Sequence, residues 1–180
     1  MNQRLYDIAI DLLKQLISIP SFSREEDKTA ELLISFFQQQ GIATNRKGNN
    51  IWAVSQQFDT AKPTLLLNSH HDTVKPNTGY TRDPFSPTIE DGKLYGLGSN
   101  DAGGALVSLI ASFLHFHDQQ DVKYNIVFVA SAEEEISGTN GIELAWSELP
   151  KIDFAIVGEP TLTDIAVSEK GLLVLDCVSN

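Results

Sequence analysis

Short apolar runs alternate with segments of helical periodicity along this chain, and this alternation limits the fold more than any other feature of the sequence. The runs have the length of strands and contain few polar residues; they are 51–54, 64–67, 125–130 and 154–157. Strands with this composition are usually buried on both faces, because helices cover both sides of the sheet. We therefore predict an α/β fold, a three-layer sandwich around a largely parallel, mixed sheet.

The segments between the apolar runs carry the signals of helices and turns. Apolar residues recur at helical spacing over 3–18. Ser23 and Glu26 have the spacing of a capping box, which predicts a second helix that continues over 30–40. The other expected elements, in chain order, are a hairpin over 88–95, helices over 101–117 and 139–147, and a strand over 171–178.

Charge and cysteine content restrict the expected partners and compartment. The formal net charge is −11, so nucleic acid and anionic membranes are poor partners. Cys177 is the only cysteine, which argues against a Cys-rich zinc site and favours a reducing, cytoplasmic location. The first residues lack the uninterrupted apolar core of a signal peptide, and no apolar run approaches the roughly 20 residues that span a bilayer.

Polar residues gather where the apolar runs end. His70 and Asp72 follow the run 64–67 with the spacing His-x-Asp, in which a carboxylate can orient a metal-binding imidazole. Asp101 lies in a glycine-rich segment after the hairpin, and the two oxygens of its carboxylate can bridge two cations. Each motif also has a plainer interpretation, namely a hydrogen-bonded structural histidine and an N-cap aspartate.

Two acidic clusters follow the later runs. Glu133, Glu134 and Glu135 come directly after 125–130, and Glu159 follows the last run. A glutamate run is usually a solvated surface, but sites in open α/β sheets gather beyond the carboxyl ends of the strands. The conjunction of all four clusters therefore predicts a metal site, and oxygen and imidazole ligands without thiolates suit zinc, cobalt or manganese.

These clusters, in this order, resemble the signatures of the M20 family of metallopeptidases and deacylases, and the likeness covers essentially the whole chain. The resemblance implies two divalent metal ions, with Zn²⁺ expected and Co²⁺ or Mn²⁺ as alternatives, held by His70, Asp101, Glu135 and Glu159. It implies that Asp101 bridges the two ions, that Asp72 orients His70, and that Glu134 is the general base. It also implies a cis peptide between Asp101 and Ala102.

Two choices of register stay open within this resemblance. His71 is adjacent to His70, and only the spacing to Asp72 selects His70. Glu133 takes the place that an aspartate usually holds in the family. A slip by one residue would make Glu133 the base and Glu134 the metal ligand.

The resemblance also implies a domain organisation. Residues 1–170 would be the N-terminal portion of the catalytic domain, and 171–180 would begin an inserted α+β lid and dimerisation domain, which allows a homodimer. A further histidine ligand of the second metal is expected beyond Asn180, because His115 and His117 have the pattern of surface residues on a helix.

The function implied by the resemblance is that of a two-metal amidohydrolase, which removes an acyl group from a small N-acylated amino acid. The expected substrate is N-acetylornithine or a close analogue, such as acetylcitrulline or succinylornithine, in arginine biosynthesis. An M20-type di- or tripeptidase or a carboxypeptidase stays open, because such substrates present the same amide carbonyl. A non-catalytic metal- or peptide-binding module is the alternative for a chain that ends naturally at Asn180.

Overall fold

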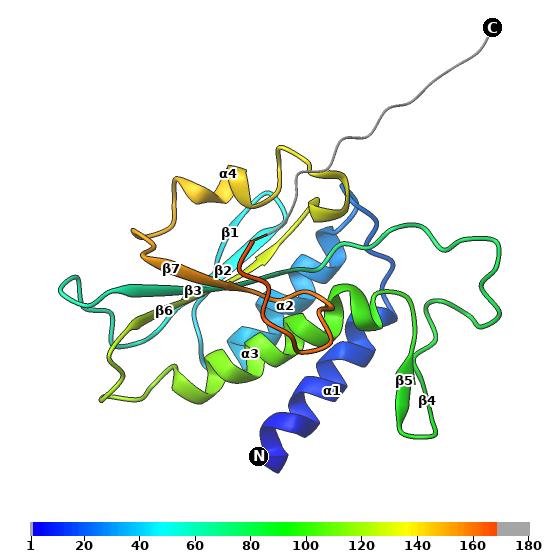
Figure 1. Cartoon of the computed structure of the whole chain (residues 1–180), viewed down its shortest axis with the longest axis horizontal. Helices are drawn as coiled ribbons and strands as arrows, with labels where there is room; N and C mark the ends of the chain where they lie inside the picture. Colours follow the sequence, from blue (N-terminus) through cyan, green and yellow to red (C-terminus); the bar gives the residue numbers. More distant parts are fainter. Residues whose placement is uncertain (1, 169–180) are drawn as a thin grey trace, which may run out of the picture.

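A computed structural model describes residues 2–168, which form a sheet with helices on both of its faces (Figure 1). In chain order, the helices, helical turns (η) and strands are α1 (Gln3–Ile17), α2 (Asp27–Gln39), β1 (Asn45–Lys47), β2 (Asn50–Val54), β3 (Thr64–His70), β4 (Thr88–Glu90), β5 (Lys93–Tyr95), η1 (Ser99–Gly104), α3 (Ala105–Phe116), β6 (Asn125–Ser131), η2 (Glu134–Ile136), α4 (Ile142–Trp146) and β7 (Phe154–Val157). Strands β4 and β5 form the hairpin predicted over 88–95, which is separate from the main sheet and projects beside α1 and α3.

The main sheet is mixed, and its parallel strands are neighbours. The strand order is β1-β2-β6-β3-β7. Strand β3 is parallel to both β6 and β7, whereas β2 is antiparallel to β6 and β1 is antiparallel to β2. The register sets Thr64 opposite Asn125 and His70 opposite Ser131. The carboxyl ends of three adjacent strands therefore lie at one edge of the sheet.

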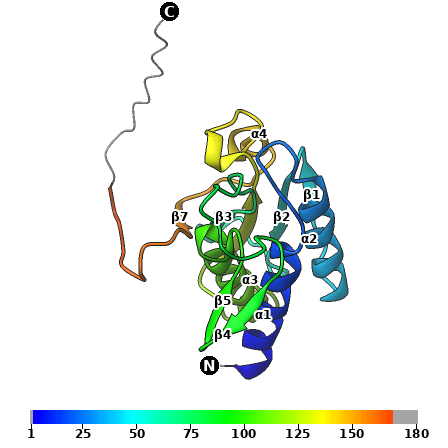
Figure 2. The ribbon, with the colours of Figure 1, turned by 90° about the vertical axis from the view of Figure 1, so that its right-hand side faces the viewer.

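Successive residues of β6 enter two different cores, which confirms the predicted three layers. Ile126, Phe128 and Ala130 pack in the core formed with α1, α2 and α3. Val127 and Val129 pack in a smaller core that includes Ala145 of α4. Every residue of β6 is buried, because side chains alternate across the strand and helices cover both faces (Figures 1 and 2).

Three aromatic rings join the larger helical layer to the sheet. Phe37 of α2, Phe113 of α3 and Phe128 of β6 are each fully buried. The ring centroids are 5.5 Å apart for Phe37 and Phe128 and 6.0 Å apart for Phe113 and Phe128. Burial of each such side chain contributes about 1.5–3 kcal/mol, so this contact fixes α2 and α3 against the strand that leads into the glutamate run.

The capping box predicted for α2 is wrong. The helix begins at Asp27, and its N-cap Glu26 makes no side-chain capping hydrogen bond. Ser23 instead donates its hydroxyl to Asp72 at 2.7 Å. Glu26 is 1% exposed, and its carboxylate bonds to other segments of the chain. The spacing is that of a local cap, but tertiary partners take both side chains.

The helix expected over 101–117 begins later than its sequence pattern suggests. Regular helix starts at Ala105, after the helical turn η1. Within η1 the backbone of Asp101 is extended, with φ −112° and ψ 102°, and the peptide to Ala102 is cis, as the resemblance implies. The helix expected over 139–147 shortens to α4. Strand β1 was missed because it is a polar, exposed edge strand of three residues.

Two further predictions concern the ends of the chain and the membrane. The domain boundary after residue 170 and the strand over 171–178 lie outside the described residues. Among the helices of 2–168, none has the length and apolar character that crossing a bilayer requires.

Candidate metal centre

The topology brings the predicted site residues to one edge of the sheet. His70 is the last residue of β3, the middle one of the three parallel strands, and Glu134 follows its neighbour β6. Glu159 follows β7 on the other side, where the Gly158 amide still donates to the Asn68 carbonyl of β3 at 2.8 Å. Residues far apart in the sequence therefore meet here because parallel strands end at the same edge.

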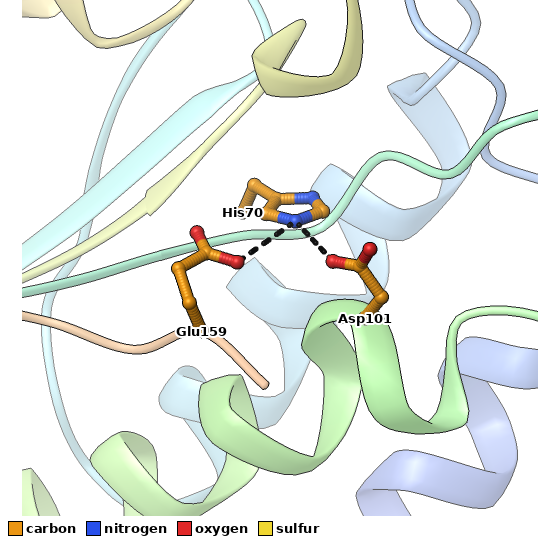
Figure 3. Close-up of side chains that lie close together, drawn as sticks. All are labelled: His70, Asp101 and Glu159. Carbon is orange, nitrogen blue, oxygen red and sulfur yellow. Dashed lines mark hydrogen bonds and ion pairs between the residues drawn. The ribbon is translucent and has the colours of Figure 1, made fainter. Parts of the chain in front are cut away.

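The imidazole of His70 is the centre of the site (Figure 3). Its Nε2 lies 3.2 Å from Asp101 Oδ1 and 3.7 Å from Glu159 Oε2. One ligand atom from each of these three residues lies within 4.8 Å of the others, which is a grouping that could hold a metal ion. The three belong to the four metal ligands that the sequence predicts.

Asp72 fixes the orientation of the His70 ring. Its carbonyl lies 3.0 Å from His70 Nδ1, and its carboxylate Oδ1 lies 3.4 Å from the same nitrogen. A carbonyl oxygen can only accept, so Nδ1 carries a hydrogen and the lone pair of a neutral ring lies on Nε2. Nε2 therefore faces the carboxylates as a potential metal donor, which is the arrangement of carboxylate-supported histidine ligands.

Asp72 also holds the turn that carries the predicted base. Its carboxylate accepts the Glu134 amide at 3.1 Å, the Glu135 amide at 3.2 Å and the Ser23 hydroxyl at 2.7 Å. Burial alone would raise the pKa of Asp72, but the hydrogen bonds from His70, Ser23 and the two amides lower it. Asp72 is thus a buried carboxylate that stays ionised and orients two parts of the site.

The two glutamates of the turn differ in position. Glu134 Oε2 lies 3.7 Å from His70 Nε2, and the side chain is half-exposed. Glu135 is outside the three-residue group around His70. Burial raises the pKa of Glu135, and the negative charge of Asp101 acts in the same direction. The metal-ligand roles, like the catalytic roles of Asp72 and Glu134, remain predictions.

The electrostatics of the site favour a bound cation. Burial alone would lower the pKa of His70, but the hydrogen bond and charge of Asp72, with the charges of Glu159 and Glu134, raise it to about 9. Burial, opposed by the charge of His70 and aided by that of Glu134, raises the pKa of Glu159 to about 6. Converging carboxylates bind protons more strongly for the same reason that they bind metal cations. The donor set therefore fits a divalent metal ion.

The structure shows which member of each adjacent pair lies beside the candidate metal centre. Both ring nitrogens of His71 are engaged, Nδ1 with the Thr29 hydroxyl and Nε2 with the Asn49 carbonyl, each at 2.9 Å. Glu133 is 5% exposed and bonds to Asn140 rather than facing His70. His70 and Glu134 are therefore the members of each pair that border the candidate metal centre.

The other two histidines lie at the far end of α3. His115 is exposed, as predicted. His117 is half-buried, with its ring 5.3 Å from that of Phe113, so the surface prediction is only partly right there. Burial lowers the pKa of His117.

Sequence reasoning missed the partners that support the site. Ser23 and Glu26 were assigned to a local cap, and Asn49 was assigned no role. Nothing in the sequence near these residues indicates that their partners lie 49, 107 and 23 positions away. The only local signal was an S-x-x-E spacing, which points to the wrong interaction.

The fold and the site define an α/β protein with a candidate histidine–carboxylate metal centre, and comparisons with known proteins place it more closely. The family description "Peptidase family M20/M25/M40" matches residues 66–170. The chain belongs to this peptidase family. The match contains every predicted site residue.

Two curated relatives are succinyl-diaminopimelate desuccinylases. The one from Buchnera aphidicola subsp. Cinara cedri is 35% identical, with 95% of this chain and 45% of the relative covered. The one from Beijerinckia indica subsp. indica is 33% identical, with 86% and 44% covered. The chain thus spans less than half the length of these relatives.

Solved structures of similar fold include two peptidases. An M20 family metallo-carboxypeptidase from Sulfolobus solfataricus is 28% identical with a TM-score of 0.68, covering 88% of this chain and 37% of that one. Human carnosine dipeptidase 1 is 22% identical with a TM-score of 0.67, covering 86% and 39%, and supports the fold alone.

Proposed function

We propose that the complete protein is a two-metal amidohydrolase that removes an acyl group from a small N-acylated amino acid. One observation carries the proposal: carboxylate oxygens of Asp101, Glu134 and Glu159 lie within 3.7 Å of the nitrogen of a single buried imidazole. Three acceptors around one nitrogen are an unfavourable arrangement for a structural network, and a natural one for metal binding.

The proposed centre holds two ions. His70 and Glu159 would hold the first ion, Asp101 would bridge to the second, and Glu135 would bind the second. Zn²⁺ suits this donor set, with Co²⁺ or Mn²⁺ as alternatives. The further histidine ligand of the second ion is expected beyond Asn180 and therefore outside the described residues. Bound divalent ions supply Lewis acidity, which polarises a carbonyl and makes water more acidic.

The remaining groups of the chain divide the proton transfer and the positioning between them. Glu134 is half-exposed beside His70 and would accept a proton from the attacking water. The same carboxyl would then return the proton to the leaving amine, which makes one group both base and acid. Asp72 would orient His70 and hold the Glu134 amide. The distance between the proposed base Glu134 and the proposed ligand His70 would thus be fixed by one residue.

The acyl group is proposed from the relatives. Both curated relatives named above are desuccinylases of succinyl-diaminopimelate, so an N-succinylated diamino acid is our first candidate. N-acetylornithine and its analogues, expected from the sequence, are the second, and their place in arginine biosynthesis has no support from these relatives. We also propose a cytoplasmic location and a homodimer through the lid domain, with neither nucleic acid nor membrane as partner.

A peptidase of the same family is the alternative, because one solved structure of similar fold is an M20 family metallo-carboxypeptidase. The test is a substrate panel for the complete, Zn²⁺-loaded protein. It contains N-succinyl-diaminopimelate, N-acetylornithine, N-acetylcitrulline, N-succinylornithine and a set of dipeptides and tripeptides. Hydrolysis of acylated amino acids with the highest kcat/KM supports the proposal. Preference for peptides would replace it with the peptidase, and no hydrolysis of any amide would favour a binding module.

A further inference from the structure

Two buried carboxylates hold three successive amides of the turn that carries Glu134. Asp72 accepts the amides of Glu134 and Glu135. The preceding amide, that of Glu133, donates to Glu26 Oε1 at 3.1 Å. Glu26 lies at the N-terminus of α2, more than 100 positions earlier in the chain. The first of the three amides is therefore anchored by a residue outside the sheet.

We propose that Glu26 is a positioning residue for the candidate active site, which holds Glu133 in its left-handed conformation and so directs the carboxylate of Glu134. This inference rests on the proposed function. Among residues 2–168, the donors to the Glu26 carboxylate include no predicted metal ligand, and we place its effect in the backbone of the turn.

The backbone at Glu133 explains why an anchor is needed there. Glu133 has φ 53° and ψ 25°, which is the left-handed region. For a residue with a side chain this conformation costs roughly 1–2 kcal/mol, so surrounding contacts must hold it. Glu133 lies between the end of β6 and η2 and directly precedes Glu134. A change in the Glu133 conformation would therefore move Glu134 directly.

Contacts on the other side of Glu133 leave its position little freedom. Its carboxylate accepts the Asn140 side-chain amide at 2.9 Å, and its carbonyl accepts the Gly138 amide at 2.8 Å. A Cβ on Gly138 would lie 2.0 Å from Glu133 Oε2. The side chain is thus fixed by the loop that follows, whereas the amide is fixed by Glu26.

Glu26 is built into the interior as an acceptor of N–H groups. It is 1% exposed, and the same Oε1 also accepts the Arg24 amide at 2.8 Å. Its other oxygen accepts the Asn49 side-chain amide at 2.9 Å. Within the described residues no Lys, Arg or His lies in ion-pair distance of it. A buried carboxylate held only by N–H donors depends on each of these bonds.

Glu26→Gln removes this acceptor capacity with little change in shape. One oxygen becomes an NH₂ group, which cannot accept. In one orientation the NH₂ group of Gln would face the backbone N–H groups of Glu133 and Arg24, and in the other it would face the side-chain NH₂ of Asn49. In either case a donor faces a donor and at least one hydrogen bond is lost. Adding Asn49→Asp places an acceptor opposite the new NH₂ group and retains the oxygen that receives the Arg46 guanidinium at 2.8 Å. The double variant can therefore keep an acceptor on Glu133.

The experiment compares the complete, Zn²⁺-loaded wild type with Glu26→Gln, Asn49→Asp, the double variant, and Glu25→Gln as the matched control. Glu25 is the exposed neighbour of Glu26. Measured are zinc content, kcat and KM on the best substrate, the melting temperature, and hydrogen exchange of the peptide that contains the 133–135 amides. We expect Glu26→Gln to lower kcat by roughly 10- to 100-fold, with KM and zinc content within about twofold of wild type.

We also expect exchange at the turn to quicken about tenfold, which corresponds to the loss of one hydrogen bond. The double variant should recover most of kcat and of the protection, and Glu25→Gln should match wild type throughout. A folded Glu26→Gln protein with normal kcat and normal exchange at the turn overturns the proposal. So does a melting temperature that falls while kcat of the folded protein and local exchange stay unchanged, because that pattern means a general structural role.

If Glu26→Gln does not fold, Glu26→Asp replaces it. This change keeps the charge but shortens the side chain by one methylene, so the same loss of kcat and protection is expected. If Glu26→Gln, its double variant with Asn49→Asp, and Glu26→Asp all fail to fold, then Glu26 supports the fold in general. That result would also overturn the proposal. If wild type hydrolyses no amide, the proposed function fails by itself, and hydrogen exchange at the turn still decides the role of Glu26.

Discussion

The two ends of the β3–β6 strand pair are both buried and polar, but their polar groups are arranged in different ways. At the amino end, Asn125 donates to the Asp59 and Lys62 carbonyls and to the Thr64 hydroxyl, and accepts the Asp59 amide. The side-chain groups of Asn125 and Thr64 therefore each have a partner within the fold. At the carboxyl end, three carboxylates face one nitrogen of His70.

This difference in the balance of donors and acceptors distinguishes a structural hydrogen-bond network from a functional site. Neutral donors and acceptors in balance satisfy one another and need nothing from outside the fold. A surplus of buried or half-buried anionic acceptors is costly, unless a cation or protons complete it. The predictions below test whether this contrast between the two ends corresponds to stability at one and chemistry at the other.

The largest expected effect is that of Glu134→Gln at the carboxyl end. Loss of the proposed base should lower kcat by about 10²- to 10⁴-fold, whereas zinc content should stay normal because Glu134 is not a proposed ligand. Turnover and bound zinc are measured on the same preparation of the complete protein. Glu143→Gln, at an exposed position in α4, serves as the control. Near-normal turnover in Glu134→Gln would remove this residue from the mechanism.

A second test concerns the metal itself. Asp101→Ala should weaken loading of both ions, because the proposed bridge contributes a ligand to each. We expect zinc affinity to fall by at least about 100-fold, more than typical losses from outer-shell partners. Asp118→Ala, beyond the other end of α3 and exposed, is the matched control. Two ions bound with wild-type affinity in Asp101→Ala would contradict the bridging role.

At the amino end we expect an effect on stability alone. Asn125→Ala leaves buried backbone groups without partners, so the free energy of unfolding should fall by about 1–3 kcal/mol. The folded variant should keep the wild-type kcat and zinc content. Denaturant titration and steady-state kinetics measure the two quantities, with the exposed Asn45→Ala as control. A large loss of kcat in the folded Asn125→Ala protein would break the proposed division between the two ends.

The smallest effect is a pH dependence of the metal-free protein. The pKa of folded His70 is raised to about 9 from an ordinary 6.5. Its protonation therefore stabilises the fold fully below pH 6.5, and this contribution is lost as the pH rises through 9. Burial lowers the pKa values of His71 and His117 from 6.5. Their titration therefore changes the stability below pH 6.5, outside the range in which His70 acts.

The measurement is the difference in unfolding free energy between wild type and His70→Asn, in the presence of a chelator, from pH 6.5 to 9.5. This difference should shrink as the pH rises. With zinc bound the trend should reverse, since the ligands must be deprotonated to bind metal. Asn125→Ala should leave the pH slope unchanged. A difference that stays constant in the metal-free protein would contradict the assigned environment of His70.

Much of the fold followed from local pattern in the sequence. The strands β3, β6 and β7 form at apolar runs, and the predicted hairpin and α1 form where the sequence indicates. Burial of the run 154–157 was wrong, because β7 is an edge strand whose four residues are exposed within the described part of the chain. The approach of Glu159 to His70 was also predictable, because the ends of parallel strands share an edge. Asp101 follows the separate β4–β5 hairpin and reaches the site from η1, which strand order alone does not predict. The residue at which α3 begins was not predictable. The small residues after Asp101 are compatible both with a regular helix and with the helical turn η1 that forms there.

Patterns of residue type and spacing determined by themselves that this chain forms an α/β sandwich with histidine and carboxylates at one sheet edge. Only the tertiary structure decided which of two adjacent histidines faces the carboxylates, and that Glu26 anchors a turn more than 100 residues away. The physical reason is that apolar periodicity and strand order are encoded locally. The hydrogen-bond partner of a buried polar group is decided by which donors the packed fold brings within about 3 Å of it.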